Sequence, residues 1–579
     1  MRLSIVHLNS GHAVALFFLA ALLLQAPAFA EMVLIEENAG NAGIRLQSQS
    51  RSGVEIHYGM DRFDFESLEV DGEQMQIVLL PGVFLPNNAG APNLPGLSRA
   101  VAIPEGASVS LEVVSAQTRT YSNIELAPAP PIQKEDDDSP LSYEKDPSIY
   151  NRDANYPENH VLVSEPTDMR GVDIVNIGVT PFQYNPVTKE LTVYTELDIR
   201  IEFVGGNGEF GENRLRNRYW EPLLRDHLLN YESLPHVDFD LPRGNREGYE
   251  YVIICPDNAE FIPWADTLKT WRNLQGISTE FYTTSETGTS HTQIEAWLNN
   301  AYNTWDIPPV AFLILGDYPG SGDDRDSGVT SPTWSYYCVS DNIYADVSGN
   351  NLPDMAHGRI TARGADDLEL MIGHMLSYER EPVTNPDFYE HPLIAGGWQT
   401  ERWFILCTEI CYGYQANVLG KDPVREYAIY SGSPGYTWST NPNTYMVVNY
   451  FGPSGLGYIP ADPSHLTDWG GNAVGVIDAV NAGAYMVLHR DHGSVFSWGE
   501  PYFGIGHISY FTTDMYPFVF TINCLTGKYN HGGQCFTEAW HRFEHGAVGL
   551  VAASEVSYSF VNDTFIWGMM DSMWPDFDP

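Results

Sequence analysis

The sequence predicts an α/β protein with a mostly parallel sheet flanked by helices, in two subdomains, preceded by an N-terminal β-sandwich. Up to residue 235, short apolar or alternating runs are separated by Gly, Pro and Asn turns, which is typical of β structure. After residue 250, apolar strands alternate with helical segments, which indicates right-handed crossovers and a parallel sheet. The 579 residues, 43% of them hydrophobic, are enough for more than one core, because single cores stop growing near about 250–300 residues.

The first thirty residues have the pattern of an export signal. Arg2 precedes an apolar stretch from residue 13 to 24, and small residues at Ala28 and Ala30 predict cleavage after Ala30. A membrane anchor needs about 20 apolar residues, and neither this stretch nor any later one is long enough. We therefore expect residues 1–30 to be a signal peptide and the protein to be secreted or at the cell surface, without stable membrane insertion.

Charge and cysteine content exclude several classes of protein. The 30 Lys+Arg against 75 Asp+Glu give a formal net charge of -45, which argues against nucleic acid or an anionic membrane as a partner. Six cysteines are few for this length and form no CxxC pair, so a disulfide scaffold, a structural zinc site and thioredoxin chemistry are all disfavoured.

Residues 31–245 are predicted to form the β-rich domain, for which a sandwich fits slightly better than a barrel. Within it, residues 127–146 are proline-rich and then acidic, which predicts an exposed loop or linker. The predicted strands include residues 75–80, 99–104, 108–114 and 190–203.

Two α/β subdomains are predicted to follow, at residues 246–385 and 386–579. A polar hinge at residues 241–250 separates them from the β-rich part. The predicted strands are residues 251–255, 310–317, 392–398, 484–494, 517–524 and 547–554, and the predicted helices are residues 260–276, 292–303, 366–380 and 535–545.

Two predicted strands end in residues that could perform chemistry. One runs into His492 and Gly493, and the other runs into Cys524. The carboxyl ends of neighbouring parallel strands share one edge of a sheet, where a histidine can stabilise a thiolate and protonate a leaving amine. Glycine at 493 allows close approach of a substrate carbonyl, and the N–H groups of Gly493 and Cys524 could form an oxyanion hole. The competing interpretation is an inert buried cysteine and a His-Gly turn.

The sequence around these residues resembles the gingipain family of cysteine peptidases, which is grouped with caspases, legumains and clostripain. The blocks AYMVLHRDHGS and FVFTINCLTGKYNHGGQCFTEAW are similar to the histidine and cysteine blocks of that family. Residues 351–360 resemble a family segment with an acidic residue before Gly-Arg, and residues 91–116 and 180–203 resemble the gingipain-type propeptide. The spaced pattern comprises Cys524, Gly527, Cys535, Phe536, Glu538 and Ala539.

The resemblance implies a caspase-like fold and an endopeptidase that cleaves protein or peptide substrates through an acyl-enzyme. By it, Cys524 is the nucleophile, His492 the acid/base and Asp354 the orienting carboxylate. It also implies a zymogen restrained by its own propeptide, and we expect activating cleavage in the hinge at Arg243 or Arg246. Two alternatives stay open: a processing peptidase of the same family that acts as a secretion-system sortase, and an inactive surface binding protein on the same fold.

The sequence also departs from the family pattern. Asp491 stands before His492 where the family more often has glycine. The chain ends at Pro579, whereas the family's catalytic domain normally continues, so we expect a truncated C-terminus. By resemblance alone, Arg or Lys would precede the cleaved bond, and Phe560 would line the primary pocket.

Metal sites are the remaining alternatives. His541, Glu544 and His545 have the spacing of a helical zinc site, but no third ligand is identifiable and Gly546 follows directly. The proposed chemistry requires no cofactor, and calcium is a candidate structural ion. The oxygen ligands that calcium prefers occur at Asp341, Asp346, Asn350 and Asp354, without the spacing of an EF-hand.

Overall fold

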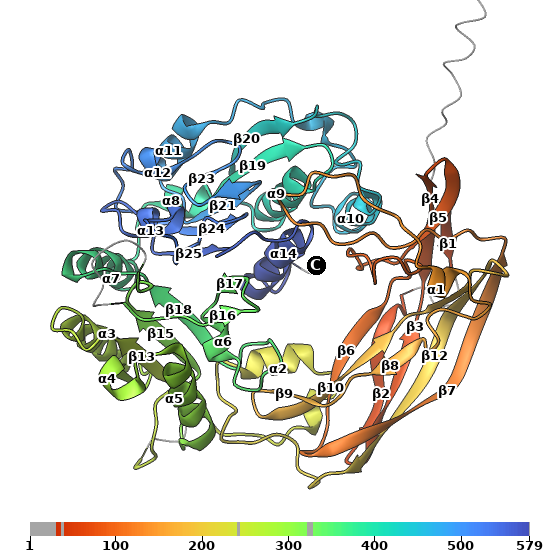
Figure 1. Ribbon diagram of the computed structural model, residues 1–579, viewed down its shortest axis with the longest axis horizontal. Coiled ribbons are helices and arrows are strands. Elements are labelled where there is room, and N and C mark those ends of the chain that lie inside the picture. Colours follow the sequence, from red (N-terminus) through yellow and green to blue (C-terminus); the bar gives the residue numbers. More distant parts are fainter. Residues whose placement is uncertain (1–30, 36–39, 240–243, 321–327, 578–579) are drawn as a thin grey trace, which may run out of the picture.

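The computed structural model describes residues 31–35, 40–239, 244–320 and 328–577. An N-terminal β region, coloured red to yellow in Figure 1, is followed by a green α/β unit and a cyan-to-blue α/β unit. The predicted fold class is confirmed, because two parallel sheets with helices follow a β-rich N-terminal part. The predicted signal peptide, residues 1–30, and Arg243 of the predicted hinge lie outside the described residues.

The N-terminal β region is a sandwich of antiparallel sheets. Its strand β12 alternates buried and less buried residues from Leu191 to Ile201, because successive side chains of a strand point to opposite faces. The buried side chains of β12 share one core with Val101 and Val175 of a second sheet, which is how two stacked sheets pack. The strands are β1 (Glu31–Leu34), β2 (Gly43–Ser50), β3 (Gly53–Gly59), β4 (Arg62–Val70), β5 (Glu73–Leu79), β6 (Leu97–Ala102), β7 (Ala107–Ser122), β8 (Val161–Val163), β9 (Thr167–Met169), β10 (Val172–Val179), β11 (Phe182–Asn185) and β12 (Glu190–Gly205).

The first α/β unit contains a four-stranded parallel sheet in the order β14-β13-β15-β18. Ile254 of β13 packs on the side of α5, whereas its neighbour Ile253 packs on the side of α3 and α7. Both faces of the sheet are therefore covered, which is why its strands read as continuous apolar runs. The elements are β13 (Tyr251–Cys255), α3 (Ile262–Leu274), β14 (Thr279–Thr283), α5 (His291–Thr304), β15 (Ala311–Leu315), β18 (Ala356–Ile360) and α7 (Ala365–Arg380).

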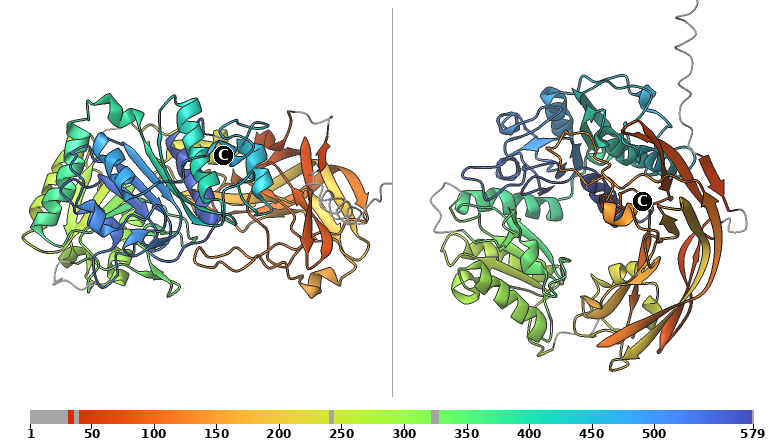
Figure 2. Two further views of the ribbon diagram at one scale, coloured as in Figure 1. Left: turned by 90° about the horizontal axis from the view of Figure 1, so that it is seen from above. Right: turned by 45° about the vertical axis from the view of Figure 1, so that its right-hand side comes forward.

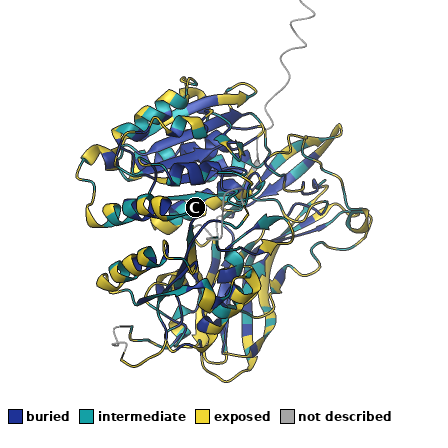
Figure 3. Cartoon of the chain, turned by 60° about the vertical axis from the view of Figure 1, so that its left-hand side comes forward, coloured by how far each residue is buried: buried dark blue, intermediate teal, exposed yellow. Residues whose placement is uncertain are grey.

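The second α/β unit contains a five-stranded parallel sheet in the order β20-β19-β21-β24-β25. Helices α9 and α14 contribute to the core on one face of the sheet, and α11 and α13 to the core on the other. Figure 3 shows the strands of this sheet as mostly buried, between helices whose outer sides are exposed. The elements are β19 (Leu393–Gln399), α9 (Phe404–Gly413), β20 (Val424–Ser431), α10 (Thr444–Phe451), α11 (Ala473–Ala482), β21 (Met486–Arg490), β24 (Phe518–Ile522), α13 (Phe536–His541), β25 (Gly549–Ala552) and α14 (Val561–Met573).

One predicted linker is placed differently from the expectation. Residues 127–146 do not form an exposed loop throughout, because Ala127, Ala129, Gln133 and Glu135 are buried. This orange chain leaves the β region after β7 and reaches the second α/β unit (Figure 1), and the second view of Figure 2 shows the same arrangement. We call residues 133–139, which contact that unit, the crossing segment.

Among the helices of the described chain, none combines the length and the apolar character needed to cross a bilayer.

Candidate active site

Neighbouring strands bring Cys524 and His492 to one edge of the second sheet. Strands β21 and β24 are parallel and in register, with Arg490 opposite Ile522. Cys524 and His492 each lie two residues beyond this pair, so they occupy equivalent positions past the carboxyl ends of adjacent strands. This is the arrangement that the sequence predicted, and it places both residues where α/β sheets gather reactive groups.

The Cys524 thiol is buried and contacts the chain after β25. Its Sγ accepts the N–H of Ser557 at 3.4 Å and lies 3.8 Å from the Ser557 hydroxyl. Burial, together with a smaller contribution from the nearby charge of Glu135, raises the pKa of Cys524 to about 11. In this state the thiol is therefore protonated at neutral pH, and a protonated thiol is a poor nucleophile.

The His492 imidazole faces Gln399 at the end of β19. Its Nε2 lies 2.7 Å from Oε1 of Gln399, and the rings of Phe404 and Tyr430 pack against it. Burial lowers the pKa of His492 to about 4, so the ring is neutral at neutral pH. No hydrogen bond between His492 and Cys524 occurs among the described residues, where each side chain has another partner.

Gly493 lies directly against the cysteine-bearing turn. A Cβ at this position would lie 2.6 Å from the side chain of Asn523 and 2.7 Å from the peptide oxygen of Cys524. Asn523 is itself held, because its Nδ2 contacts His489 Nδ1 at 2.9 Å and its Oδ1 accepts the hydroxyl of Thr526 at 2.7 Å. Any larger residue at 493 would therefore displace the backbone that carries the thiol.

Asp354 is placed away from His492. It lies just before β18 of the first sheet, where its carboxylate accepts the N–H of Ser348 at 2.9 Å and its peptide oxygen accepts from Arg170 at 2.9 Å. In the described part of the chain, no hydrogen bond joins it to His492. The structure therefore does not bring Asp354 to the imidazole, and the side chain that contacts His492 is Gln399.

Asp491 is buried rather than directed to solvent. Its carboxylate accepts the N–H of Glu500 and fits against Gly397 and Gly499, where a Cβ would lie within 2.6 Å of it. Burial raises the pKa of this carboxyl well above its usual range. The two glycines thus make room for a carboxyl that the sequence alone identified only as a departure.

The crossing segment from the N-terminal part covers this edge of the sheet. The N–H of Glu135 donates to the peptide oxygen of Ser557 at 2.9 Å, and the Glu135 carboxylate pairs with Arg490 at 2.8 Å. Gln399 donates to Asp138 at 2.9 Å, and Arg402 donates to Gln133 at 3.1 Å. One short segment therefore binds the residues that surround Cys524 and His492.

Comparisons with known proteins match both parts of the chain. The family model described as Peptidase family C25 matches residues 245–577, and the model Propeptide_C25 matches residues 36–234. The chain belongs to peptidase family C25. The resemblance to gingipains and to their propeptide is thereby confirmed.

Relatives of this C25 chain include two gingipains of Porphyromonas gingivalis. Gingipain R2 of strain W83 is 24% identical over 539 residues, which cover 90% of this chain and 65% of the relative. Lys-gingipain of strain ATCC 33277 is 24% identical over 564 residues, which cover 94% of this chain and 30% of the relative. The chain thus spans less than two thirds of the length of these curated relatives. The crystal structure of the Arg-specific cysteine proteinase gingipain R (RgpB) is 20% identical, covers 56% of this chain and 66% of that chain, and has a TM-score of 0.42.

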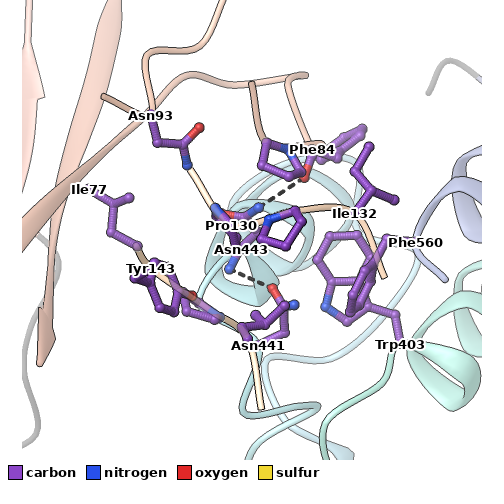
Figure 4. Close-up of a pocket in the computed structure, with 14 residues that line it drawn as sticks. Ile77, Phe84, Asn93, Pro130, Ile132, Tyr143, Trp403, Asn441, Asn443 and Phe560 are labelled. Carbon is purple, nitrogen blue, oxygen red and sulfur yellow. Dashed lines mark hydrogen bonds between the residues drawn. The ribbon is translucent and has the colours of Figure 1, made fainter. Parts of the chain in front are cut away.

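Phe560 lines a pocket between the N-terminal part of the chain and the second α/β unit. Its ring packs edge-on against Trp403 with 4.7 Å between centroids, and residues Pro130 and Ile132 line the same pocket (Figure 4). The segment that leads into the crossing segment therefore forms one wall of this pocket.

The suspected zinc motif lacks the helical geometry that it requires. Helix α13 ends at His541 instead of continuing to residue 545, so Glu544 and His545 lie beyond it. His545 contacts Asp514 at 2.9 Å, and the peptide oxygen of Glu544 contacts His374. Within the described residues, no three His, Cys, Asp or Glu side chains are grouped so that they could hold a metal ion.

The oxygen ligands considered for calcium are engaged by the protein itself. Asp341 pairs with Arg359 at 2.7 Å, and Asp346 accepts the N–H groups of Gly349, Asn350 and Asn351 at 2.8–3.0 Å. The bonds of Asp346 are turn contacts, and that of Asp341 is an ion pair with β18, so structural calcium stays a prediction.

Four residues at the site were not identified from the sequence. Arg490 and Gln399 stand at strand ends, which is a usable signal, but neither is a usual nucleophile or base. Ser557 and Glu135 carry no local signal, since one lies in a loop and the other in an acidic run that resembles a solvated linker.

Proposed function

We propose that this chain is the zymogen of a secreted or cell-surface cysteine endopeptidase, with Cys524 as nucleophile and His492 as general acid and base. The observation that carries the proposal is the register of β21 and β24, which puts these residues at equivalent positions beyond adjacent strands in a family C25 chain. Thiol and imidazole supply the nucleophile and the proton transfers, so the proposed chemistry needs no cofactor.

The contact with Gln399 suits His492 to proton transfer. Because Nε2 donates to Oε1 of Gln399, the lone pair of the neutral ring is on Nδ1, which takes the proton of Cys524. The thiolate attacks the substrate carbonyl, the C–N bond breaks as His492 protonates the amine, and a thioester remains. Water, deprotonated by His492, then hydrolyses the thioester and restores the thiol. In this proposal the N–H groups of Gly493 and Cys524 stabilise the oxyanion.

The crossing segment keeps the proposed enzyme latent. With the segment in place, the pKa of Cys524 is raised to about 11 and that of His492 is lowered to about 4. Both shifts favour the neutral pair over the thiolate–imidazolium pair. Release of the segment would restore water and remove the charge of Glu135, so the pKa of Cys524 should fall.

Cleavage in the hinge is the proposed activating step. Arg246 is exposed, and a cut there would separate the N-terminal part from the α/β units. Activity of purified zymogen with the hinge intact would contradict this step.

Substitution of Cys524 tests the proposed function. Full-length protein is cut by trypsin at the hinge, trypsin is inhibited, and hydrolysis of denatured casein is measured. We expect Cys524→Ala to abolish hydrolysis and Cys255→Ala, in the other parallel sheet, to retain it. Hydrolysis that survives Cys524→Ala, or that only a zinc chelator stops, would overturn the proposed function.

A further inference from the structure

The crossing segment pairs with residues 557–559 beside Cys524 through an antiparallel β-bridge between Lys134 and Tyr558. The N–H of Glu135 donates to the peptide oxygen of Ser557 at 2.9 Å, and the N–H of Ser559 donates to the peptide oxygen of Gln133 at 3.0 Å. Backbone bonds of this kind are also made when an extended peptide adds to a strand edge, where pockets for its side chains give specificity. Since the N–H of Ser557 also contacts the Cys524 sulfur, Glu135 is the residue of the segment bound next to the nucleophile.

The pocket that receives the Glu135 side chain presents hydrogen-bond donors. The carboxylate accepts from Nη1 of Arg490 at 2.8 Å, from Nδ2 of Asn562 at 2.9 Å and from the hydroxyl of Ser559 at 3.3 Å. Glu135 and Arg490 are both fully buried. A planar guanidinium together with two further donors matches a carboxylate, which can only accept.

We propose that this pocket is the primary specificity pocket of the enzyme and that it selects glutamate as the residue before the cleaved bond. This inference rests on the proposed function, because it assumes that Cys524 attacks a peptide held as the crossing segment is held. The substrate class is thus a protein or peptide with an accessible glutamate, in place of the Arg or Lys that the family resemblance implies.

A basic side chain does not fit the same pocket. The buried carboxylate in this pocket, Asp563, already accepts a hydrogen bond from Nε of Arg490 at 2.7 Å. An incoming cation would therefore be placed against the guanidinium. Arg490 also stacks on Phe404, with 4.4 Å between guanidinium and ring centroid, which holds it in the pocket. Like charges at such range repel strongly in a dry site. Burial raises the pKa of Glu135, and the positive charges of Arg490 and Arg402 oppose that shift.

The backbone after Glu135 explains why the segment inhibits without being an extended substrate. The N–H of Asp137 returns to the peptide oxygen of Lys134 at 3.2 Å, which closes a turn. Arg402 then holds the peptide oxygen of Asp137, and Gln399 holds the Asp138 carboxylate. The chain beyond Glu135 is therefore turned back instead of continuing as an extended peptide beside residues 557–559.

The intact zymogen provides the first test. Glu135→Arg puts a cation into the pocket, and Asp136→Arg makes the same charge change at the exposed neighbouring residue. We expect Glu135→Arg to accelerate iodoacetamide alkylation of Cys524 at least about 10-fold, whereas Asp136→Arg leaves the rate within about 2-fold of wild type. Equal rates for wild type and Glu135→Arg would overturn the pocket assignment.

The activated protein provides the second test, with peptide amides that differ only in the residue before the cleaved bond. We expect kcat/KM for Glu to exceed that for Gln about 10-fold and those for Arg and Lys at least about 100-fold. Arg490→Gln should reduce the Glu-to-Gln ratio to near one, whereas Arg425→Gln, in another ion pair of the same sheet, should retain it. Should Arg490→Gln not fold, Asn562→Ala is expected to reduce the ratio in the same direction.

The outcomes separate the two proposals. Faster, Cys524-dependent cleavage after Arg or Lys would overturn the glutamate pocket and leave the peptidase standing. Cleavage of none of these peptides, with no casein hydrolysis, would overturn the proposed function and this inference with it.

Discussion

Glu135 and Arg490 form an ion pair of 2.8 Å between Oε1 and Nη1, across 355 residues of sequence and with both side chains fully buried. Arg490 ends the strand β21 that leads to His492, and Glu135 belongs to the acidic run between β7 and β8. The pair therefore joins the propeptide part of the chain to the strand that carries the proposed acid/base.

Loss of Arg490 should destabilise the zymogen strongly. Arg490→Met would leave the carboxylates of Glu135 and Asp563 buried without their cation, which costs about 3–5 kcal/mol when one partner of a buried pair is removed. Arg200→Met, which removes an exposed pair with Glu55 and Glu112, should cost at most about 1 kcal/mol. Urea unfolding of the full chain measures both, and equal losses would contradict the importance of the buried pair.

Activation should change the pH dependence of Cys524 alkylation. In the zymogen its pKa is raised to about 11, so the thiolate that reacts with iodoacetamide forms only at alkaline pH, and the alkylation rate should rise with an inflection near that value. After release of the N-terminal part we expect the inflection at lower pH. Mass spectrometry of the peptide containing Cys524 follows the rate, and an inflection that does not move would argue against latency through the thiol.

Gln399→Glu should change the pH profile rather than abolish activity. A carboxylate beside Nε2 stabilises the imidazolium and so raises the pKa of His492, which moves the acidic limb of kcat/KM to higher pH. It would also repel Asp138, which Gln399 now binds, and thereby weaken the hold of the crossing segment. Gln275→Glu on the first α/β unit serves as the control. An acidic limb at the wild-type pH would show that Gln399 does not position the imidazole.

Gly493→Ala should damage the site by steric contact. The added methyl group would lie 2.6 Å from Asn523 and 2.7 Å from the Cys524 peptide oxygen, so the turn must shift at a cost of about 1–3 kcal/mol. Gly506→Ala, where the structure leaves open space, is the matched control. Thermal unfolding and casein hydrolysis are measured together, and full activity of Gly493→Ala would mean that the turn tolerates displacement.

Local sequence patterns predicted the strands of the second sheet well. The runs before His492 and Cys524 are apolar on both faces because helices cover both sides of β21 and β24. The helix containing His541 was predicted too long, since periodicity continues to residue 545 while the chain turns back after α13. A Cβ at Gly546 would lie 2.1 Å from the Trp540 peptide oxygen, which shows how closely it returns.

Contacts between distant parts of the chain could not be predicted from such patterns. The proline-rich and acidic composition of residues 127–146 describes how an isolated segment behaves in water, and it predicts exposure. Burial of Glu135 depends on a cation supplied by β21 and on donors supplied by α14 and by the loop before it. The contact at the His492 imidazole likewise depends on a distant residue, because Gln399 of β19 lies 93 residues upstream.

Strand periodicity and buried apolar runs are local properties, so the two parallel sheets, the β-rich N-terminal region and the positions of Cys524 and His492 at strand ends could be predicted from the amino-acid sequence alone. The side chains that meet at these strand ends follow from the packing of the folded chain, which brings Gln399 and not Asp354 to the imidazole and places Glu135 beside the thiol. Those contacts form when separately built sheets pack together, and charge pairing in a buried site selects partners by position in space and not by distance along the chain.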